Sequence, residues 1–98
     1  MRRFTVWLNA DAEDDILNSY EWGVENWGEA AAEKWIGEMY DAMLDRLSTF
    51  PERCPIAPDV DLPDREIMYL PLGRYRILYE IRGSEVIILH VRGPFAGD

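Results

Sequence analysis

The chain has 98 residues and a formal net charge of −9, with 48% hydrophobic and 12% aromatic residues. A chain of this length forms one domain, and its apolar content can supply a core, which disfavours intrinsic disorder. The single cysteine excludes an intrachain disulfide and fits a reducing compartment. The longest apolar run, residues 86–89, is too short to span a membrane. We expect residues 1–98 to form one cytoplasmic domain without membrane contact.

The first half of the chain predicts a short strand and two helices. Residues 4–8 alternate apolar and polar side chains, as a strand does. Asp11 is the expected N-cap of a first helix, and Gly28 is its expected C-terminal cap. A second helix is expected over residues 29–49, until Pro51 stops it. Because the connection is short, the two helices should form an antiparallel hairpin.

The second half predicts a loop and three strands. Residues 51–64 contain four prolines and an acidic cluster of Asp59, Asp61 and Asp64, which we interpret as solvated. Strands are expected over residues 65–70, 74–81 and 86–92, joined by short glycine-containing turns as an antiparallel meander. The order β-α-α-β-β-β predicts an α+β fold, with a helical hairpin packed on one face of a four-stranded, mostly antiparallel sheet.

Basic residues are concentrated in these last strands, whereas the helical part is acidic. Lysine occurs once in the whole chain, at Lys34. Arginine suits bidentate contact with phosphate or carboxylate. Residues 65–92 carry the only histidine, His90, and five arginines: Arg65, Arg74, Arg76, Arg82 and Arg92.

Alternation along the strands predicts which side chains face the helices. Trp35, Ile36, Met39, Met43 and Leu47 should pack on a sheet face formed by Ile77, Tyr79, Leu89 and Val91. The opposite face should then carry Arg74, Arg76, His90 and Arg92 together. This basic face has two interpretations, a solvated sheet surface or an anion site.

His90 is a candidate general acid or base near neutral pH, and the alternative is a structural hydrogen-bonding role. A zinc site is not expected, because the sequence has no second histidine and no cysteine pair. The acidic loop lacks an EF-hand pattern, and no glycine-rich nucleotide motif or G-x-S-x-G motif occurs. We therefore expect no metal and no cofactor.

Four segments together resemble a known family. They are A-x-x-D-I-L-N-S-Y near the start, A-x-x-W-I-x-x-M-Y-D-A-M-x-x-L-x-x-F-P in the second helix, then L-G-R-Y-R-I-L-Y-E-I and V-I-I-L-H-V-R. This pattern is similar to the RelE/ParE superfamily, the toxins of type II toxin–antitoxin pairs that are often called plasmid stabilisation proteins. The resemblance covers almost the whole chain and implies a β-α-α-β-β-β fold, in agreement with the order above.

The resemblance implies a toxin that is neutralised by a cognate antitoxin in a hetero-oligomer, and two kinds of target. ParE-like members inhibit DNA gyrase, whereas RelE-like members cut messenger RNA on the ribosome without a metal. Arg76 matches the arginine of the family's Y-R-I-x-Y segment, and Arg92 lies where the last strand often carries a base. The next position, often histidine in the family, is Gly93, and the lysines typical of the nucleases are missing.

These departures favour the ParE-like role, with Arg65, Arg74, Arg76 and Arg92 as target-binding residues. In the nuclease alternative, Arg76, His90 and Arg92 would be catalytic. A third alternative is a member that has lost toxicity and is kept as a binding module. The excess of aromatic residues predicts that the antitoxin contributes an amphipathic segment, and helix-in-groove binding needs such apolar anchors.

Overall fold

The computed structural model describes residues 3–57 and 65–93, so the acidic cluster of Asp59, Asp61 and Asp64 lies outside the described residues. The predicted α+β fold is confirmed, and a short 3-10 helix follows the second helix. In chain order the elements are β1 Thr5–Leu8, α1 Ala10–Trp27, α2 Glu29–Thr49, η1 Pro51–Arg53, β2 Met68–Leu72, β3 Tyr75–Arg82 and β4 Glu85–Arg92.

The two helices form the predicted hairpin, but α1 begins earlier than expected. Its N-cap is Asn9, not Asp11, and the Asn9 side chain accepts a 2.9 Å hydrogen bond from the Ala12 N–H. An N-cap oxygen must reach an N–H two or three residues ahead, and Asn9 occupies that position here. Gly28 ends α1 with φ +93, a conformation that favours glycine, and α2 begins at the next residue.

The sheet has the strand order β1-β4-β3-β2, in which β1 pairs parallel with β4 and the other two pairs are antiparallel. Strand β2 extends through Pro71 and Leu72, which the sequence predicts as a turn. Proline donates no backbone hydrogen bond and is therefore tolerated on an edge strand such as β2. The turn to β3 shrinks to Gly73 and Arg74, with Gly73 at φ +60.

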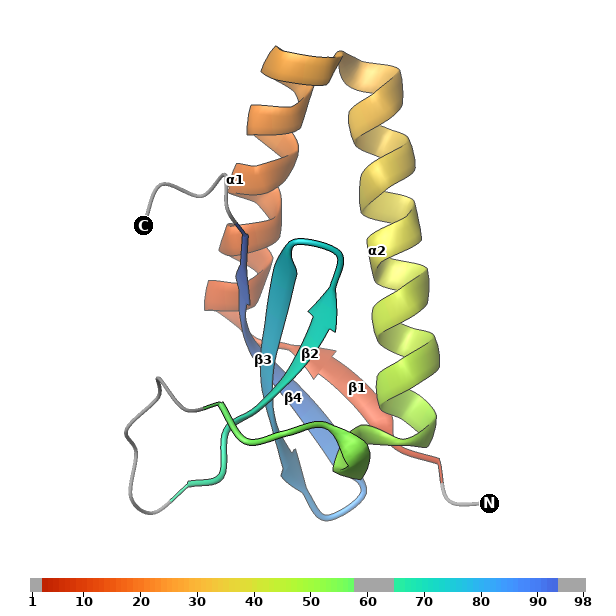
Figure 1. The fold of residues 1–98 in the computed structure, drawn as a ribbon, viewed down its shortest axis with the longest axis vertical. Helices are drawn as coiled ribbons and strands as arrows, with labels where there is room; N and C mark the ends of the chain where they lie inside the picture. The colour runs from red at the N-terminus through yellow and green to blue at the C-terminus, as the bar shows by residue number, and fades with distance from the viewer. Residues whose placement is uncertain (1–2, 58–64, 94–98) are drawn as a thin grey trace.

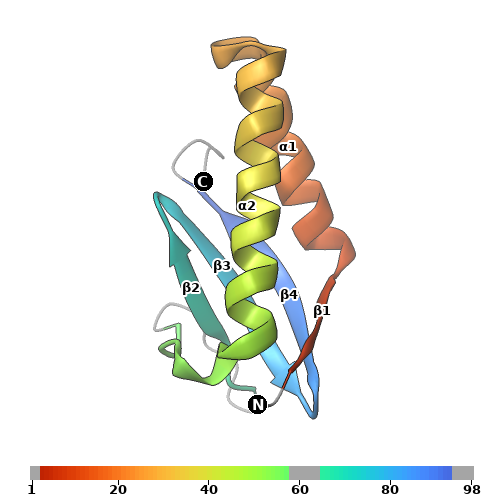
Figure 2. The same ribbon diagram turned by 90° about the vertical axis from the view of Figure 1, so that its right-hand side faces the viewer.

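Both helices cover one face of the sheet, and the tip of the hairpin projects past the ends of the strands (Figures 1 and 2). The core lies between these layers. It combines Ile16 of α1 with Met39, Met43 and Leu47 of α2 and with Ile77, Tyr79, Val86, Ile88 and Val91 of the sheet. Trp35 and Ile36 are partly buried against it.

A β-bulge in β4 makes one part of the predicted core wrong. Leu78 pairs with His90 while its neighbour Tyr79 pairs with Ile88, so Leu89 is an extra residue. Because an extra residue inverts the alternation, Val86 and Ile88 pack in the core with the helices, and the predicted Leu89 does not. Leu89 packs instead in a second cluster on the opposite face, with Ala57, Ile67 and Leu78.

The face away from the helices is partly covered, although the sequence predicts it uncovered. The segment after η1 pairs with the start of β2: the Ala57 N–H donates to Ile67 O at 2.7 Å, and the Tyr69 N–H donates to Pro55 O at 3.0 Å. We call this side of the sheet the outer face.

Among the described residues, no helix is long and apolar enough to cross a membrane.

Candidate functional site

A pocket of about 270 Å³ on the outer face brings together residues from four parts of the chain. Strand β4 contributes His90 and Arg92 beyond the bulge, and the segment before β2 contributes Arg65. The first turn of α1 and its cap add polar groups. The full lining is Asn9, Asp11, Arg65, Ile67, Leu78, Leu89, His90 and Arg92. We call this the basic pocket, although Asp11 places one carboxylate in it.

His90 is oriented by an acid from α1. Its Nδ1 lies 3.2 Å from Oδ2 of Asp15, and the same oxygen accepts a 2.9 Å hydrogen bond from the Val91 N–H. A neutral imidazole that donates through Nδ1 keeps Nε2 as an acceptor. The Asp15 carboxylate therefore anchors α1 to β4 and orients the His90 ring.

Arg65 reaches the basic pocket with its guanidinium already engaged. Its Nε donates to Oε2 of Glu80 at 2.7 Å, and its Nη2 lies 2.7 Å from Oε1 of the same carboxylate. Arg82 adds a second ion pair with Glu80 Oε1 at 2.6 Å. The hydrogen bond from Arg65, helped by the charges of both arginines, lowers the pKa of the Glu80 carboxyl below its ordinary value although burial opposes this.

The other three arginines of the predicted target-binding set lie at two different places in the structure. Arg76 and Arg92 are cross-strand partners on the outer face, and the Arg76 guanidinium lies 5.2 Å from the centroid of the Tyr69 ring. Arg74 does not join them, because it belongs to the β2–β3 turn and lines a different cavity next to α2. The alternation that placed it on the outer face does not apply to a residue outside the strand.

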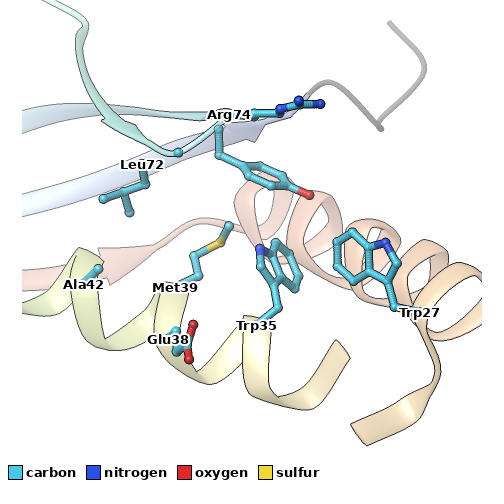
Figure 3. Close-up of a pocket in the computed structure, with 9 residues that line it drawn as sticks. Trp27, Trp35, Glu38, Met39, Ala42, Leu72 and Arg74 are labelled. Atoms are coloured by element: carbon cyan, nitrogen blue, oxygen red, sulfur yellow. The ribbon is translucent and has the colours of Figure 1, made fainter. Parts of the chain in front are cut away.

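That cavity is an apolar groove between α2 and the β2–β3 turn (Figure 3). It has a volume of about 420 Å³ and is lined by Trp27, Trp35, Glu38, Met39, Ala42, Leu72, Gly73, Arg74 and Tyr75. We call it the aromatic groove. The Trp27 and Trp35 rings lie 6.3 Å apart in an edge arrangement, and the Trp35 and Tyr75 rings lie 5.2 Å apart.

The end of β4 is shaped by Tyr75. Gly93 follows Arg92 and is buried, and a Cβ added there would lie 2.2 Å from Cε1 of Tyr75. The Tyr75 ring therefore fills the space that a side chain at position 93 would occupy.

Within the described residues, no group of three or more histidine, cysteine or acidic side chains is placed to hold a metal ion.

Sequence reasoning missed Asp15 and the aromatic groove. Asp15 follows Glu13 and Asp14 in an acidic run near the start of α1, so nothing local distinguishes the carboxylate that reaches β4. The groove combines residues from α1, α2, the end of β2, the β2–β3 turn and the start of β3, which only the packed fold brings together. A signal existed in the aromatic excess of the chain, which the sequence analysis connected to a partner surface.

Among the solved structures with this fold are two toxin–antitoxin systems. The toxin–antitoxin complex RelBE2 from Mycobacterium tuberculosis aligns with a TM-score of 0.67 and 20% identity over 95% of this chain and 93% of that chain. The chromosomal ParDE toxin–antitoxin system from P. aeruginosa aligns with a TM-score of 0.72 and 15% identity over 93% and 96%. No curated protein sequence matches the chain.

A helical hairpin on one face of a four-stranded mixed sheet is thus the architecture of the RelE/ParE toxins, which the sequence predicts. The family described as "ParE toxin of type II toxin-antitoxin system, parDE" matches residues 6–93. Because this match spans most of the chain, the protein belongs to the ParE toxin family of type II toxin–antitoxin systems.

Proposed function

We propose that this toxin acts by binding and inhibiting a protein target, with DNA gyrase as the candidate, and that it does not cleave RNA. The observation that carries the proposal is the packing of Gly93. The superfamily resemblance associates nuclease members with a histidine at this position, and Tyr75 occupies the corresponding space here. A histidine could not be accommodated without moving a buried ring of the fold.

The charges of the basic pocket support the same proposal. Arg65 is bound to Glu80, and Asp11 adds a carboxylate beside His90 and Arg92. Binding to RNA is strengthened by lysine and arginine side chains that contact phosphates and so release counterions from the RNA. This chain as a whole carries a net charge of −9. This balance fits recognition of a protein surface better than a contact with ribosomal RNA.

The decisive experiment compares the two targets directly. The purified toxin should inhibit DNA supercoiling by gyrase in a dose-dependent manner and should leave messenger RNA intact in a translating extract, as read by primer extension. RNA cut at defined sites, with unaffected gyrase, would overturn the proposal.

The nuclease alternative has one observation in its favour. His90 is oriented by Asp15 and lies in the same pocket as Arg92, so a base and a cationic group could flank a phosphate. In that case replacing His90 with glutamine should abolish RNA cleavage without unfolding the protein.

We also propose that a cognate antitoxin neutralises the toxin in a hetero-oligomer, as the relatives with solved structures are toxin–antitoxin systems. The candidate is a small protein encoded beside the toxin gene. Co-expression with a tag on the toxin alone should recover this neighbour in a stable complex and restore growth. A toxin that stays monomeric and captures no neighbouring product would contradict this part.

A further inference from the structure

Trp7 of β1 presents its ring on the outer face of the sheet. Its neighbours Val6 and Leu8 pack against the core, so alternation along the strand directs Trp7 to the opposite side. Trp7 pairs with Ile87 of β4, which in turn pairs with Glu80 of β3, so the three residues form one cross-strand row. Trp7 is 52% exposed. The indole thus gives the outer face an apolar surface that the fold does not bury.

The Trp7 ring is held in place by β4. Its Nε1 donates a 2.6 Å hydrogen bond to Oε2 of Glu85. This bond satisfies the polar atom of the ring and restricts its rotation, so little conformational entropy is left to lose on binding. A large, rigid and half-exposed aromatic side chain is the kind of residue that anchors protein interfaces.

The basic pocket begins close to Trp7. Asn9, two residues further along the same segment, lines that pocket, and so does His90 of β4. His90 follows Ile87, the strand partner of Trp7, by three residues, so roughly 10 Å of strand separate the two rows. One short partner segment could therefore reach the indole and the pocket together.

The charges of the pocket fit a single carboxylate. Arg65 is held by Glu80, whereas Arg92 is exposed and makes no ion pair among the described residues. Asp11 adds an opposing charge to the lining, which disfavours a polyanion. A lone carboxylate that pairs with Arg92 satisfies both conditions.

We propose that Trp7 and the basic pocket form one binding surface for an acidic segment of the protein that the toxin inhibits. An apolar side chain of that segment packs on the indole, and a carboxylate enters the pocket and pairs with Arg92. In an extended segment, residues two or four positions apart point to the same side and lie roughly 7 and 13 Å apart, which brackets the separation of the two rows. This inference rests on the proposed function and adds the chemistry of the target segment and an apolar anchor.

Inhibition of DNA supercoiling by purified gyrase tests the anchor with the whole toxin. Trp7→Ala should raise the toxin concentration for half-inhibition by about 30-fold, as loss of an interface hot spot does. Trp7→Phe keeps a ring and should lose less. Phe50→Ala is the matched control, because Phe50 is an aromatic residue at the end of α2 with 47% exposure. This control should stay within about twofold of wild type, and thermal unfolding followed by circular dichroism checks that each variant is folded.

Arg92 tests the acidic chemistry of the target segment. Arg92→Glu should weaken inhibition more than Arg92→Ala, because a negative side chain repels an incoming carboxylate. Binding of labelled toxin to gyrase at low and high salt gives a second comparison. The loss in Arg92→Ala should shrink at high salt, whereas the loss in Trp7→Ala should persist, because salt screens charges and not an apolar contact.

The outcomes separate this inference from the proposed function. Wild-type inhibition by Trp7→Ala, or equal inhibition by the two Arg92 variants, would overturn the inference and leave gyrase inhibition intact. Loss of antitoxin capture by Trp7→Ala with unchanged gyrase inhibition would assign the surface to the antitoxin and also overturn it. A wild-type toxin without effect on gyrase would contradict the proposed function itself, and this inference would fall with it.

Discussion

Asp15 of α1 and His90 of β4 lie 3.2 Å apart, between Oδ2 and Nδ1, although 75 residues separate them in the chain. The same carboxylate oxygen accepts the Val91 N–H, so it is bonded to the strand immediately after the bulge. This contact joins the helical layer to the strand that carries His90 and Arg92. The position of the basic pocket thus depends on a residue of the opposite layer.

Replacing Asp15 with alanine should destabilise the fold by about 1–3 kcal/mol, because the part-buried Val91 N–H loses its acceptor. Asparagine keeps an acceptor oxygen and should cost less. Urea unfolding of both variants measures the difference, and Asp14→Ala, exposed and one residue away, is the control. Equal stability of Asp15→Ala and wild type would show that the carboxylate is not an anchor.

Met43→Ala should destabilise the protein by about 2–5 kcal/mol, as expected for a fully buried side chain whose removal leaves a cavity. Met43 belongs to the same buried cluster as Ile16 of α1 and Tyr79 and Ile88 of the sheet. Urea unfolding followed by tryptophan fluorescence gives the free energy. The exposed neighbour Asp41→Ala should change stability little, and similar curves for the two variants would mean that the packing of α2 is wrongly described.

Glu80 should make stability depend on pH in the acidic range. Its pKa is lowered in the folded state, mainly by the hydrogen bond from Arg65, so the folded protein holds the charged form more strongly than the unfolded chain does. That contribution is present above the ordinary pKa of 4.5 and is lost as the pH falls through the lower folded value. Glu80→Gln should therefore lose less stability than wild type on acidification through this window.

The matched control is Glu66→Gln, an exposed acid beside Arg65 in the segment before β2. Urea unfolding at a series of pH values gives the difference in the free energy of unfolding between each variant and the wild type. The series runs from neutral pH to about pH 3, below the ordinary pKa of a carboxyl group. A flat difference between wild type and Glu80→Gln would contradict a stabilising ion pair.

Gly93→Ala should be destabilising, because its Cβ would lie 2.2 Å from the Tyr75 ring. Overpacking of this kind costs about 1–3 kcal/mol when a ring must move. Gly37→Ala is the opposite control: Gly37 lies in α2 with open space around it, and alanine there should stabilise by about 1 kcal/mol. Thermal melts compare the two, and Gly93→Ala combined with Tyr75→Leu should recover part of the loss.

Arg76 and Arg92 test the outer face. Replacing both with alanine should remove growth inhibition while the protein stays folded, since Arg92 is exposed and Arg76 does not belong to the buried core. Arg76→Lys separates the mechanisms, because a bidentate phosphate contact needs the guanidinium whereas a protein contact tolerates a simple positive charge. A folded double variant that remains fully toxic would move the target-binding surface to the helical hairpin.

Much of the fold could be predicted because its signals are local. Apolar periodicity defines α2 with the bounds that the structure has, and Gly28 marks the boundary between the helices because its φ of +93 suits glycine. Turn chemistry and alternation locate the three last strands to within a few residues. These signals depend on residues within one or two turns of each other, which a sequence displays directly.

The site depended on tertiary structure. One extra residue at Leu89 inverted the faces of half a strand, since register is decided by the pairing of two strands and not by either alone. Arg65 forms an ion pair with Glu80, and His90 contacts Asp15. Arg74 lines the aromatic groove, away from the other arginines. The sequence by itself determined the elements, their order and the supply of arginines. Only packing decided that Arg65 meets Glu80 and that His90 meets Asp15, because these contacts join residues 15 and 75 positions apart.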